Sequence, residues 1–278
     1  GFEADFVPKG AKFTSKRKAA RKRILEVANA LTGHKFADDT LIVATSGRYE
    51  FKNKGIDVFI HAMRRCLDQS ADLKNEVLAL IQVPGWVAGP RADLQARLDF
   101  PQVYDTALDN PVITHDLHEM QHDQVLNLFR ALNISNSEES KVKVIFVPCY
   151  LDGVDGIFQM PYYDLLIGND LAVYPSYYEP WGYTPLEAVA FHVPCITTSL
   201  SGFGIWAQTV KGDISTLEDG VEVIARNDYN NDEVAQGICH ALLRYSACSD
   251  QERDAMRKKA SALSKKALWK QAICWWGQ

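Results

Sequence analysis

The hydrophobic residues of this chain fall into short apolar runs that alternate with longer stretches of helical spacing. The runs, rich in Val, Ile and Leu, predict buried strands at 40–45, 76–83, 141–148, 171–174, 194–198 and 220–225. Apolar residues three or four positions apart predict helices beyond residue 16 and at 56–66, 92–98, 117–132, 163–168, 186–191, 232–245 and 250–275. Alternating strands and helices favour an α/β fold, a Rossmann-like parallel sheet with helices on both faces.

Composition narrows the class of protein. Of the 278 residues, 47% are hydrophobic and 23% are charged, as in an ordinary globular domain. The formal net charge of −5 disfavours general nucleic-acid binding. The six cysteines lack Cys-x2-Cys spacing and no apolar run approaches ~20 residues, so we expect a cytoplasmic protein with reduced thiols and no membrane partner. The polar stretch at about 86–140 predicts a partly helical insertion in one domain that spans residues 1–278.

The segment from Pro175 to Glu187 concentrates the candidate chemistry of the chain. It links a predicted strand to a predicted helix, with Glu179 at the carboxyl end of the strand and Glu187 on the first helical turn. Ligands of open α/β sheets bind at this edge. Carboxylates suit the hydroxyls of a sugar, and the backbone amides of 182–184 suit a phosphate at a helix N-terminus. The alternative, a turn capped by Thr184 with Glu187 favouring the helix dipole, fits the local pattern equally well.

Two cations and an aromatic residue are further candidates at the same edge of the sheet. Arg48 and Lys54 follow the first predicted strand, where they would neutralise the charge on a leaving diphosphate. Cations are also common on surface loops, and Glu50 stands between these two. Tyr162, at the start of a short predicted helix, offers a face for a nucleobase or is a half-buried tyrosine. The residues alone leave both interpretations open at each position.

The sequences of two segments resemble those of a known family. Residues 47–57, Gly-Arg-Tyr-Glu-Phe-Lys-Asn-Lys-Gly-Ile-Asp, and residues 175–204, which include Tyr-Tyr-Glu-Pro-Trp-Gly-Tyr-Thr-Pro, resemble glycogen synthases of the eukaryotic type. These are retaining glycosyltransferases of the two-domain GT-B type with a Glu-x7-Glu motif. Residues 1–8 are similar to the sequence segment that follows the N-terminal domain in that family. The resemblance implies a C-terminal, nucleotide-sugar-binding domain, with the N-terminal acceptor domain absent from this sequence and the fragment inactive by itself.

The resemblance also implies roles for individual residues. The full enzyme would transfer glucose from UDP-glucose to the non-reducing end of an α-1,4-glucan with retention, while ADP-glucose and the oligomeric state stay open. Glu179 would lie near the glucose, Glu187 at the ribose, and Arg48 and Lys54 at the diphosphate in place of a metal. No metal and no cofactor besides the donor substrate are therefore expected. The other residues implied at the substrate are Tyr162, at the uracil, and Trp181, Gly182, Tyr183 and Thr184.

Two other functions compete with this interpretation. His118, Glu119 and His122 fall on a predicted helix and match the His-Glu-x-x-His pattern of zinc metallopeptidases, although a third ligand is not evident. The second alternative is a non-catalytic glucan-binding scaffold, and the intact pair Glu179 and Glu187 speaks against it.

Three further segments carry weaker signals. The six cations within 16–23 predict a solvated helix face in preference to a phosphate patch. Residues 201–204 predict a loop that permits close backbone approach. Residues 252–259 are sparser in arginine than the sugar-phosphate sensor of the resembling family, so activation by glucose-6-phosphate is not expected.

Overall fold

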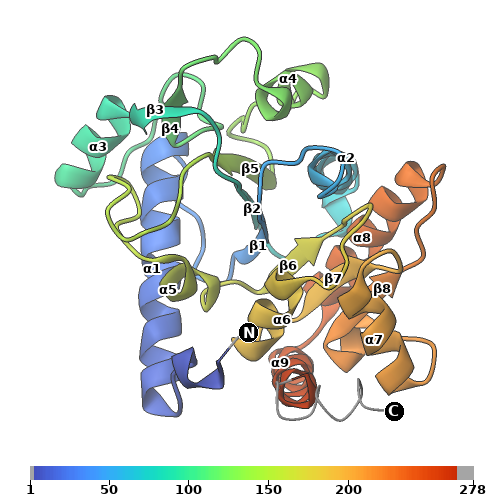
Figure 1. Ribbon diagram of the computed structural model, residues 1–278. Helices are drawn as coiled ribbons and strands as arrows, with labels where there is room; N and C mark the ends of the chain where they lie inside the picture. Colours follow the sequence, from blue (N-terminus) through green and yellow to red (C-terminus); the bar gives the residue numbers. More distant parts are fainter. Residues whose placement is uncertain (1–2, 268–278) are drawn as a thin grey trace.

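The computed structural model describes residues 3–267, and a six-stranded parallel sheet forms its centre (Figure 1). The strands lie in the order β5-β2-β1-β6-β7-β8. Their bounds are Leu41–Ser46 (β1), Val77–Gln82 (β2), Val142–Val147 (β5), Leu171–Tyr174 (β6), Cys195–Thr198 (β7) and Val221–Ile224 (β8). The order reverses between β1 and β6, which is where open α/β sheets bind their ligands. The predicted parallel α/β sheet is confirmed.

Helices cover both faces of the sheet because successive strand residues point to opposite sides. Leu41 and Val43 of β1 join one core cluster, while Ile42 and Ala44 join another. The helices of the first cluster are α2 (Ile56–Asp68), α4 (Gln124–Ala131) and α8 (Asn231–Ala247). Those of the opposite face are α1 (Ala11–Thr32), α3 (Ala92–Asp99), α5 (Tyr162–Leu166), α6 (Tyr183–Ala190), α7 (Gly202–Lys211) and α9 (Asp250–Lys266). Figure 1 shows α2 and α8 on one side of the sheet and α1 and α5 on the other.

The segment at 86–140 is less peripheral than its polarity suggests. It holds a two-stranded antiparallel ribbon, β3 (Val87–Pro90) and β4 (His115–Leu117), besides α3 and α4. The helix expected at 117–132 begins only at Gln124, where the Asp123 carboxylate accepts a hydrogen bond from the amide of Leu126 at 2.9 Å. Phe129 of α4 is buried in the main core, so this segment supplies a crossover helix of the sheet and not a polar insertion alone.

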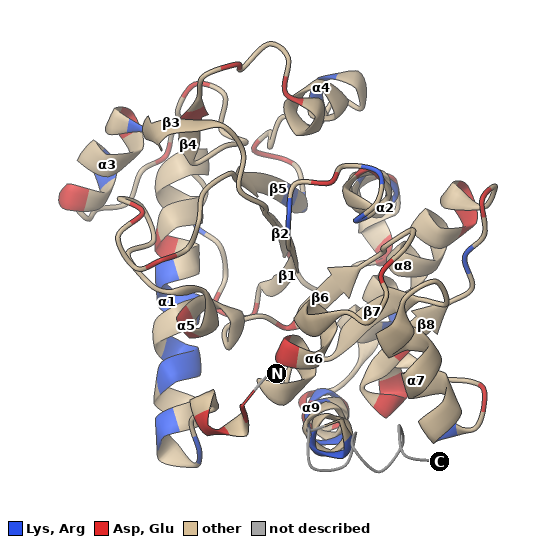
Figure 2. Cartoon of the chain, in the orientation of Figure 1, with Lys and Arg blue, Asp and Glu red and all other residues tan. Residues whose placement is uncertain are grey.

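The basic run in α1 is only in part the predicted solvated face. Lys18 and Lys22 are exposed, whereas the three arginines turn inward. Arg17 and Arg21 bind the carboxylate of Asp170 at 2.9 and 2.7 Å, and Arg257 of α9 joins them at 3.1 Å. Arg23 donates to the backbone carbonyl of Phe158. Figure 2 shows basic residues along the lower half of α1 and around α9. These guanidinium groups form internal contacts, so they do not form a phosphate-binding patch.

The C-terminal helix predicted at 250–275 is described as far as Lys266, and Trp269, Trp275 and Trp276 lie outside the described residues. None of the helices within residues 3–267 combines the length and apolar character that crossing a bilayer requires.

Candidate functional site

The loop after β1 meets the loop after β6 at the point where the strand order reverses. The backbone amide of Tyr177 donates to the carbonyl of Asn53 at 2.8 Å. Gly55 has φ 69° and approaches Pro175 so closely that a Cβ atom would lie 1.9 Å from the Pro175 carbonyl oxygen. Only glycine fits both the backbone angle and this distance. The contact carries Lys54 across to the end of β6.

An ion pair between Lys54 and Glu179 is the centre of this site. The Lys54 ammonium donates to the Glu179 carboxylate, and the two side chains are 17% and 22% exposed. The backbone of Glu179 is fixed from the other side, since its carbonyl accepts the amide of Gly202 at 2.9 Å. Glu179 and Lys54, which the sequence places on separate loops, are therefore in contact at the edge of the sheet.

The N-terminus of α6 opens next to this ion pair. Gly182, with φ 107°, precedes the helix, and no side chain caps it. Thr184 lies within the helix, so the alternative in which it caps the turn is wrong. The amides of Tyr183 and Thr184 in the first turn are left for an external anion.

Glu187 is the fifth residue of α6, one turn further from the helix end than the sequence predicts. Its half-buried carboxylate accepts a hydrogen bond from the Tyr163 hydroxyl at 3.2 Å. Burial raises the pKa of Glu187, and the hydrogen bond from Tyr163 only partly opposes this. The Tyr163 ring is held by Phe191, with centroids 5.0 Å apart. Among the described residues, no cation pairs with this acceptor group.

Replacing Glu187 with glutamine is expected to raise the free energy of unfolding at pH 7 by about 1 kcal/mol, because a half-buried charge is removed. The folded-state pKa exceeds the unfolded value, so the wild-type chain gains stability as the pH falls through it. The difference between the two proteins should therefore shrink from pH 8 to pH 5 in urea denaturation. Glu233→Gln, at an exposed position of α8, should show no such trend. A gap that widens on acidification would contradict the expectation.

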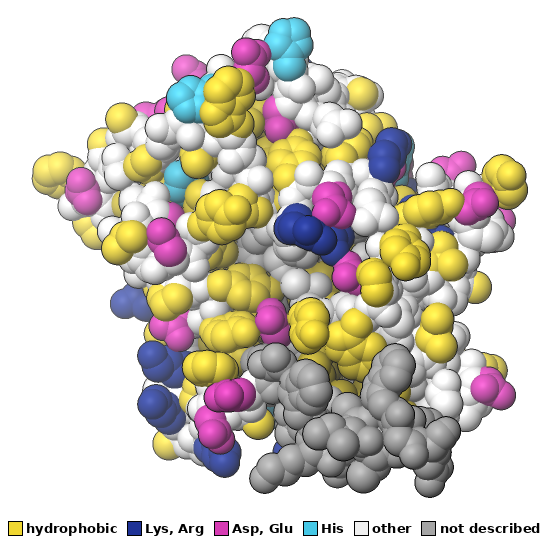
Figure 3. Space-filling model, in the orientation of Figure 1, with side chains coloured by type: hydrophobic (Ala, Val, Ile, Leu, Met, Phe, Trp, Pro, Cys, Tyr) yellow, Lys and Arg dark blue, Asp and Glu magenta, His cyan; other side chains and the backbone are white. Residues whose placement is uncertain are grey.

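A cavity of about 620 Å³ lies over the carboxyl ends of β1, β2 and β5. Three predicted site residues line it, namely Arg48, Tyr162 and Thr184, together with apolar surface such as Leu151. Its volume suits a small organic ligand. The Arg48 side chain is 81% exposed and lies 3.4 Å from Glu50, so it can turn toward an anion. Figure 3 shows a hollow in this face of the molecule, bordered by basic, acidic and hydrophobic side chains.

Tyr162 presents its ring to the cavity from the first residue of α5. Its hydroxyl and that of Ser46 are 2.7 Å apart and share a hydrogen bond. Burial raises the pKa of Tyr162 to about 12, which keeps the phenol protonated. The ring is therefore anchored at its polar end, in a residue that lines the cavity.

The structure places Trp181 beside α7, and its expected contact with the substrate stays a prediction. Its ring packs against Phe203 and Trp206, each with centroids 6.0 Å away, and it is absent from the cavity lining. The expected loop at 201–204 is also wrong, since α7 begins at Gly202. The close backbone approach is right, because a Cβ on Gly202 would lie 2.1 Å from the carbonyl oxygen of Pro180. Both features hold the loop that carries Glu179 in place.

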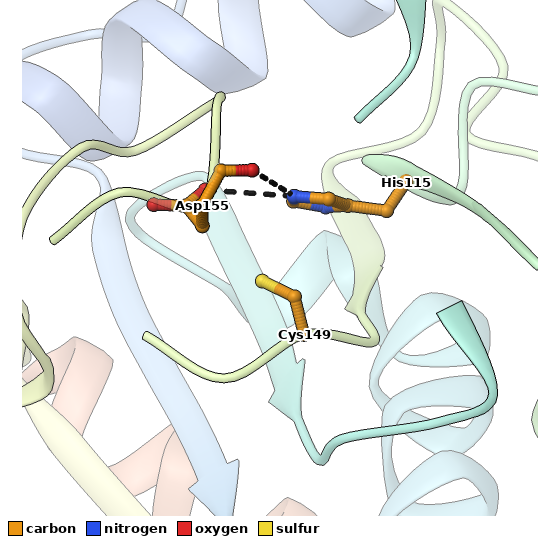
Figure 4. A group of neighbouring side chains, drawn as sticks. All are labelled: His115, Cys149 and Asp155. Carbon is orange, nitrogen blue, oxygen red and sulfur yellow. Dashed lines mark hydrogen bonds and ion pairs between the residues drawn. The ribbon is translucent and has the colours of Figure 1, made fainter. Parts of the chain in front are cut away.

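The structure contradicts the zinc metallopeptidase alternative. His118, Glu119 and His122 are exposed and lie in turns, so the two histidines do not share a helical face. The ring of His118 lies instead beside Trp86, with centroids 4.9 Å apart. Among residues 3–267, the one cluster of three potential metal ligands is elsewhere, at His115, Cys149 and Asp155 (Figure 4).

Two of the three residues of that cluster, His115 and Asp155, already form hydrogen bonds. His115 Nε2 lies 3.0 Å from the Asp155 carbonyl oxygen, which can only accept, so Nε2 carries a hydrogen. The other ring nitrogen faces the Thr114 hydroxyl at 2.7 Å. Burial opposes ionisation of Asp155, but the bonds from His115 and the amides of 157–159 lower its pKa. The cluster thus fixes the loop that borders the cavity, and burial raises the pKa of Cys149 to about 12.

The structure adds a residue that sequence reasoning missed. Gln82 ends β2 and lines the cavity, although it is 5% exposed. The available signal was a polar residue that closes an otherwise apolar strand at the ligand-binding edge.

Comparison with known proteins adds to this geometry. The model of the family described as glycogen synthase matches residues 103–276, which is more than half of the chain. The chain belongs to the glycogen synthase family. Similar family members include the glycogen [starch] synthases of Neurospora crassa, 26% identical, and Caenorhabditis elegans, 28% identical, each over 84% of this chain. The alignments cover 40% and 42% of those relatives, so the chain spans less than half of their length.

Solved structures resemble this glycogen synthase family member in fold. WaaG, a glycosyltransferase involved in lipopolysaccharide biosynthesis, superposes with a TM-score of 0.50 at 16% identity, over 90% of this chain and 46% of its own. Anabaena HepE in complex with UDP-glucose gives a TM-score of 0.50 at 15% identity, over 96% and 51%. The likeness to both structures confirms the expected α/β fold class.

Proposed function

We propose that this chain is the donor-binding C-terminal domain of a glycogen synthase. The domain comprises residues 1–278, with the segment at 86–140 built into it, and a separate N-terminal domain would supply the acceptor groove. The complete enzyme would transfer glucose from UDP-glucose to the non-reducing end of an α-1,4-glucan with retention. The observation that carries this proposal is the contact of Lys54 with Glu179, beside an uncapped helix N-terminus and a ligand-sized cavity.

The cationic groups and the aromatic residue of the site match different parts of a sugar nucleotide. The diphosphate would be held by the point charge of Lys54 and by the planar guanidinium group of Arg48. The first amides of α6 would bind it at the helix N-terminus. Positive charge supplied in this way would stabilise the leaving UDP without a metal ion. Tyr162, which lines the cavity, would stack on the uracil.

The two carboxylates would then act on the sugars of the donor. Glu179, at the mouth of the crevice, would hold hydroxyls of the glucose and stabilise positive charge as the bond to the diphosphate breaks. Glu187, held by Tyr163 and not by a cation, would accept hydrogen bonds from the ribose hydroxyls.

We place the protein in the cytoplasm. Cysteines 66, 149, 195, 239 and 248, which are the described ones, are all free thiols. This supports a reducing, cytoplasmic location. The partners of the complete enzyme would be UDP-glucose and an α-1,4-glucan.

Calorimetric titration of the chain with UDP, UDP-glucose, ADP and ADP-glucose tests this function. We expect saturable binding of UDP and UDP-glucose, weaker binding of the adenine nucleotides, and no glucan synthesis by the chain alone. Tighter binding of ADP than UDP would reassign the donor. A lack of saturable binding by all four nucleotides would contradict the proposal, and so would glucan synthesis without a second domain.

A further inference from the structure

Gln82 lines the cavity and has a buried, unpaired acceptor atom. In the sheet, Gln82 is in register with Ser46 of β1 and Val147 of β5. Its Oε1 is one of five buried side-chain polar atoms without a hydrogen-bond partner among residues 3–267. Of these five, it alone belongs to a residue that lines this cavity. Oε1 is covered in the ligand-free chain, so a ligand donor can reach it only when the side-chain amide turns toward the cavity. Such pairing would remove the cost of an unpaired buried acceptor.

The neighbours of Gln82 indicate which part of a ligand comes within reach. Ser46, its partner in the register, holds the hydroxyl of Tyr162, whose ring lines the same cavity. A flat heterocycle on the Tyr162 ring would direct one edge toward the ends of β1 and β2. The groups proposed to hold the diphosphate come from other elements, the loop after β1 and the start of α6. The register with Ser46 thus associates the glutamine with Tyr162, the residue proposed to stack on the nucleobase.

We propose that Gln82 reads the base edge of the donor nucleotide, with Oε1 accepting a hydrogen bond from the N3–H group of uracil. Uracil presents this single donor between two carbonyl oxygens. The glutamine amide matches that pattern, because Oε1 accepts while Nε2 donates to a carbonyl. This inference rests on the proposed function, since it requires UDP in the cavity. It makes Gln82 a residue that determines base specificity.

The test pairs a change in the protein with a change in the ligand. Gln82→Met keeps the length of the side chain and removes its polar atoms, whereas Gln102→Met makes the same change at an exposed position as a control. Each chain is titrated with UDP and with UDP methylated at N3 of the base. We expect the wild type and the control to prefer UDP about tenfold. Gln82→Met should bind UDP about tenfold more weakly and show no preference.

The apo stability of the variant separates recognition from structure. Removal of an unpaired acceptor should leave the midpoint of thermal unfolding of Gln82→Met equal to or above that of the wild type. If the midpoint falls, Gln82→Glu, which retains an acceptor oxygen, decides the matter. Preference for UDP in that variant would support the proposal, and its loss would overturn it.

The outcomes also separate this inference from the proposed function. Unchanged UDP affinity and an unchanged preference in Gln82→Met would overturn the role of Gln82 and leave the donor site intact. A wild type that binds methylated and unmethylated UDP equally would do the same. Absence of saturable UDP binding in the wild type would overturn both.

Discussion

Replacing Lys54 with methionine is expected to weaken UDP binding by about 100-fold, the upper part of the range for losing a charge-assisted hydrogen bond. Two effects add at this position. The ammonium no longer attracts the diphosphate, and Glu179 loses its partner in a site where the carboxylate is 22% exposed. The unpaired carboxylate would then repel the anionic ligand. Calorimetric titration of both chains with UDP measures the loss.

Two matched variants show which effect dominates. Lys52→Met removes a cation from the same loop, but Lys52 binds Asp57 at 2.8 Å and is 77% exposed, so UDP affinity should stay within about twofold. Combining Lys54→Met with Glu179→Gln removes the repulsion. Recovery of most of the affinity would mean that Lys54 mainly neutralises Glu179, whereas a persistent loss would mean that it holds the diphosphate. Wild-type affinity in Lys54→Met itself would refute the site.

Replacing Asp170 with alanine is expected to lower the free energy of unfolding by about 3–5 kcal/mol, because buried cations lose their partner. The Asp170 side chain is 8% exposed and binds Arg17, Arg21 and Arg257. It also accepts the backbone amide of Ile42 at 2.8 Å. The carboxylate thus ties α1 and α9 to β1. Urea denaturation at pH 7 measures the loss.

The pH dependence of this loss has a definite sign. Burial opposes ionisation of Asp170, but Arg21, Arg17 and Arg257 outweigh it and lower the pKa of the carboxyl group. A lowered folded-state pKa gives stability that is fully present above the unfolded value, about 3.9. It disappears as the pH falls through the folded-state pKa. The difference between wild type and variant should therefore be constant from pH 5 to 8 and close only in strong acid.

A surface carboxylate provides the control for Asp170. Asp164 of α5 lies 3.9 Å from Lys16, and its side chain is 37% exposed. Asp164→Ala should change the free energy of unfolding by less than about 1 kcal/mol. Similar losses in the two variants would contradict a special role for the buried cluster, and so would a loss below 1 kcal/mol in Asp170→Ala.

Local patterns in the sequence determined the fold class and the edge at which the site lies. Short Val- and Ile-rich runs such as 141–148 predict strands buried on both faces, and alternation with helices predicts that such strands are parallel. The carboxyl ends of parallel strands share one edge, so Arg48, Lys54 and Glu179 could be assigned to it from their positions alone. Where the pattern was short and polar, as at His118 and His122, local spacing did not distinguish a helix from turns.

Only the tertiary structure decided which of these residues meet. Lys54 and Glu179 are 125 positions apart, and their contact depends on β1 lying next to β6. The same is true of Asp170, whose partners come from two helices at opposite ends of the chain, and of Gln82, whose unpaired oxygen exists only inside the assembled cavity. Periodicity along the chain records which side of an element is buried. Burial and pairing between distant side chains arise only when the strand order brings them together, and the sequence does not encode that order locally.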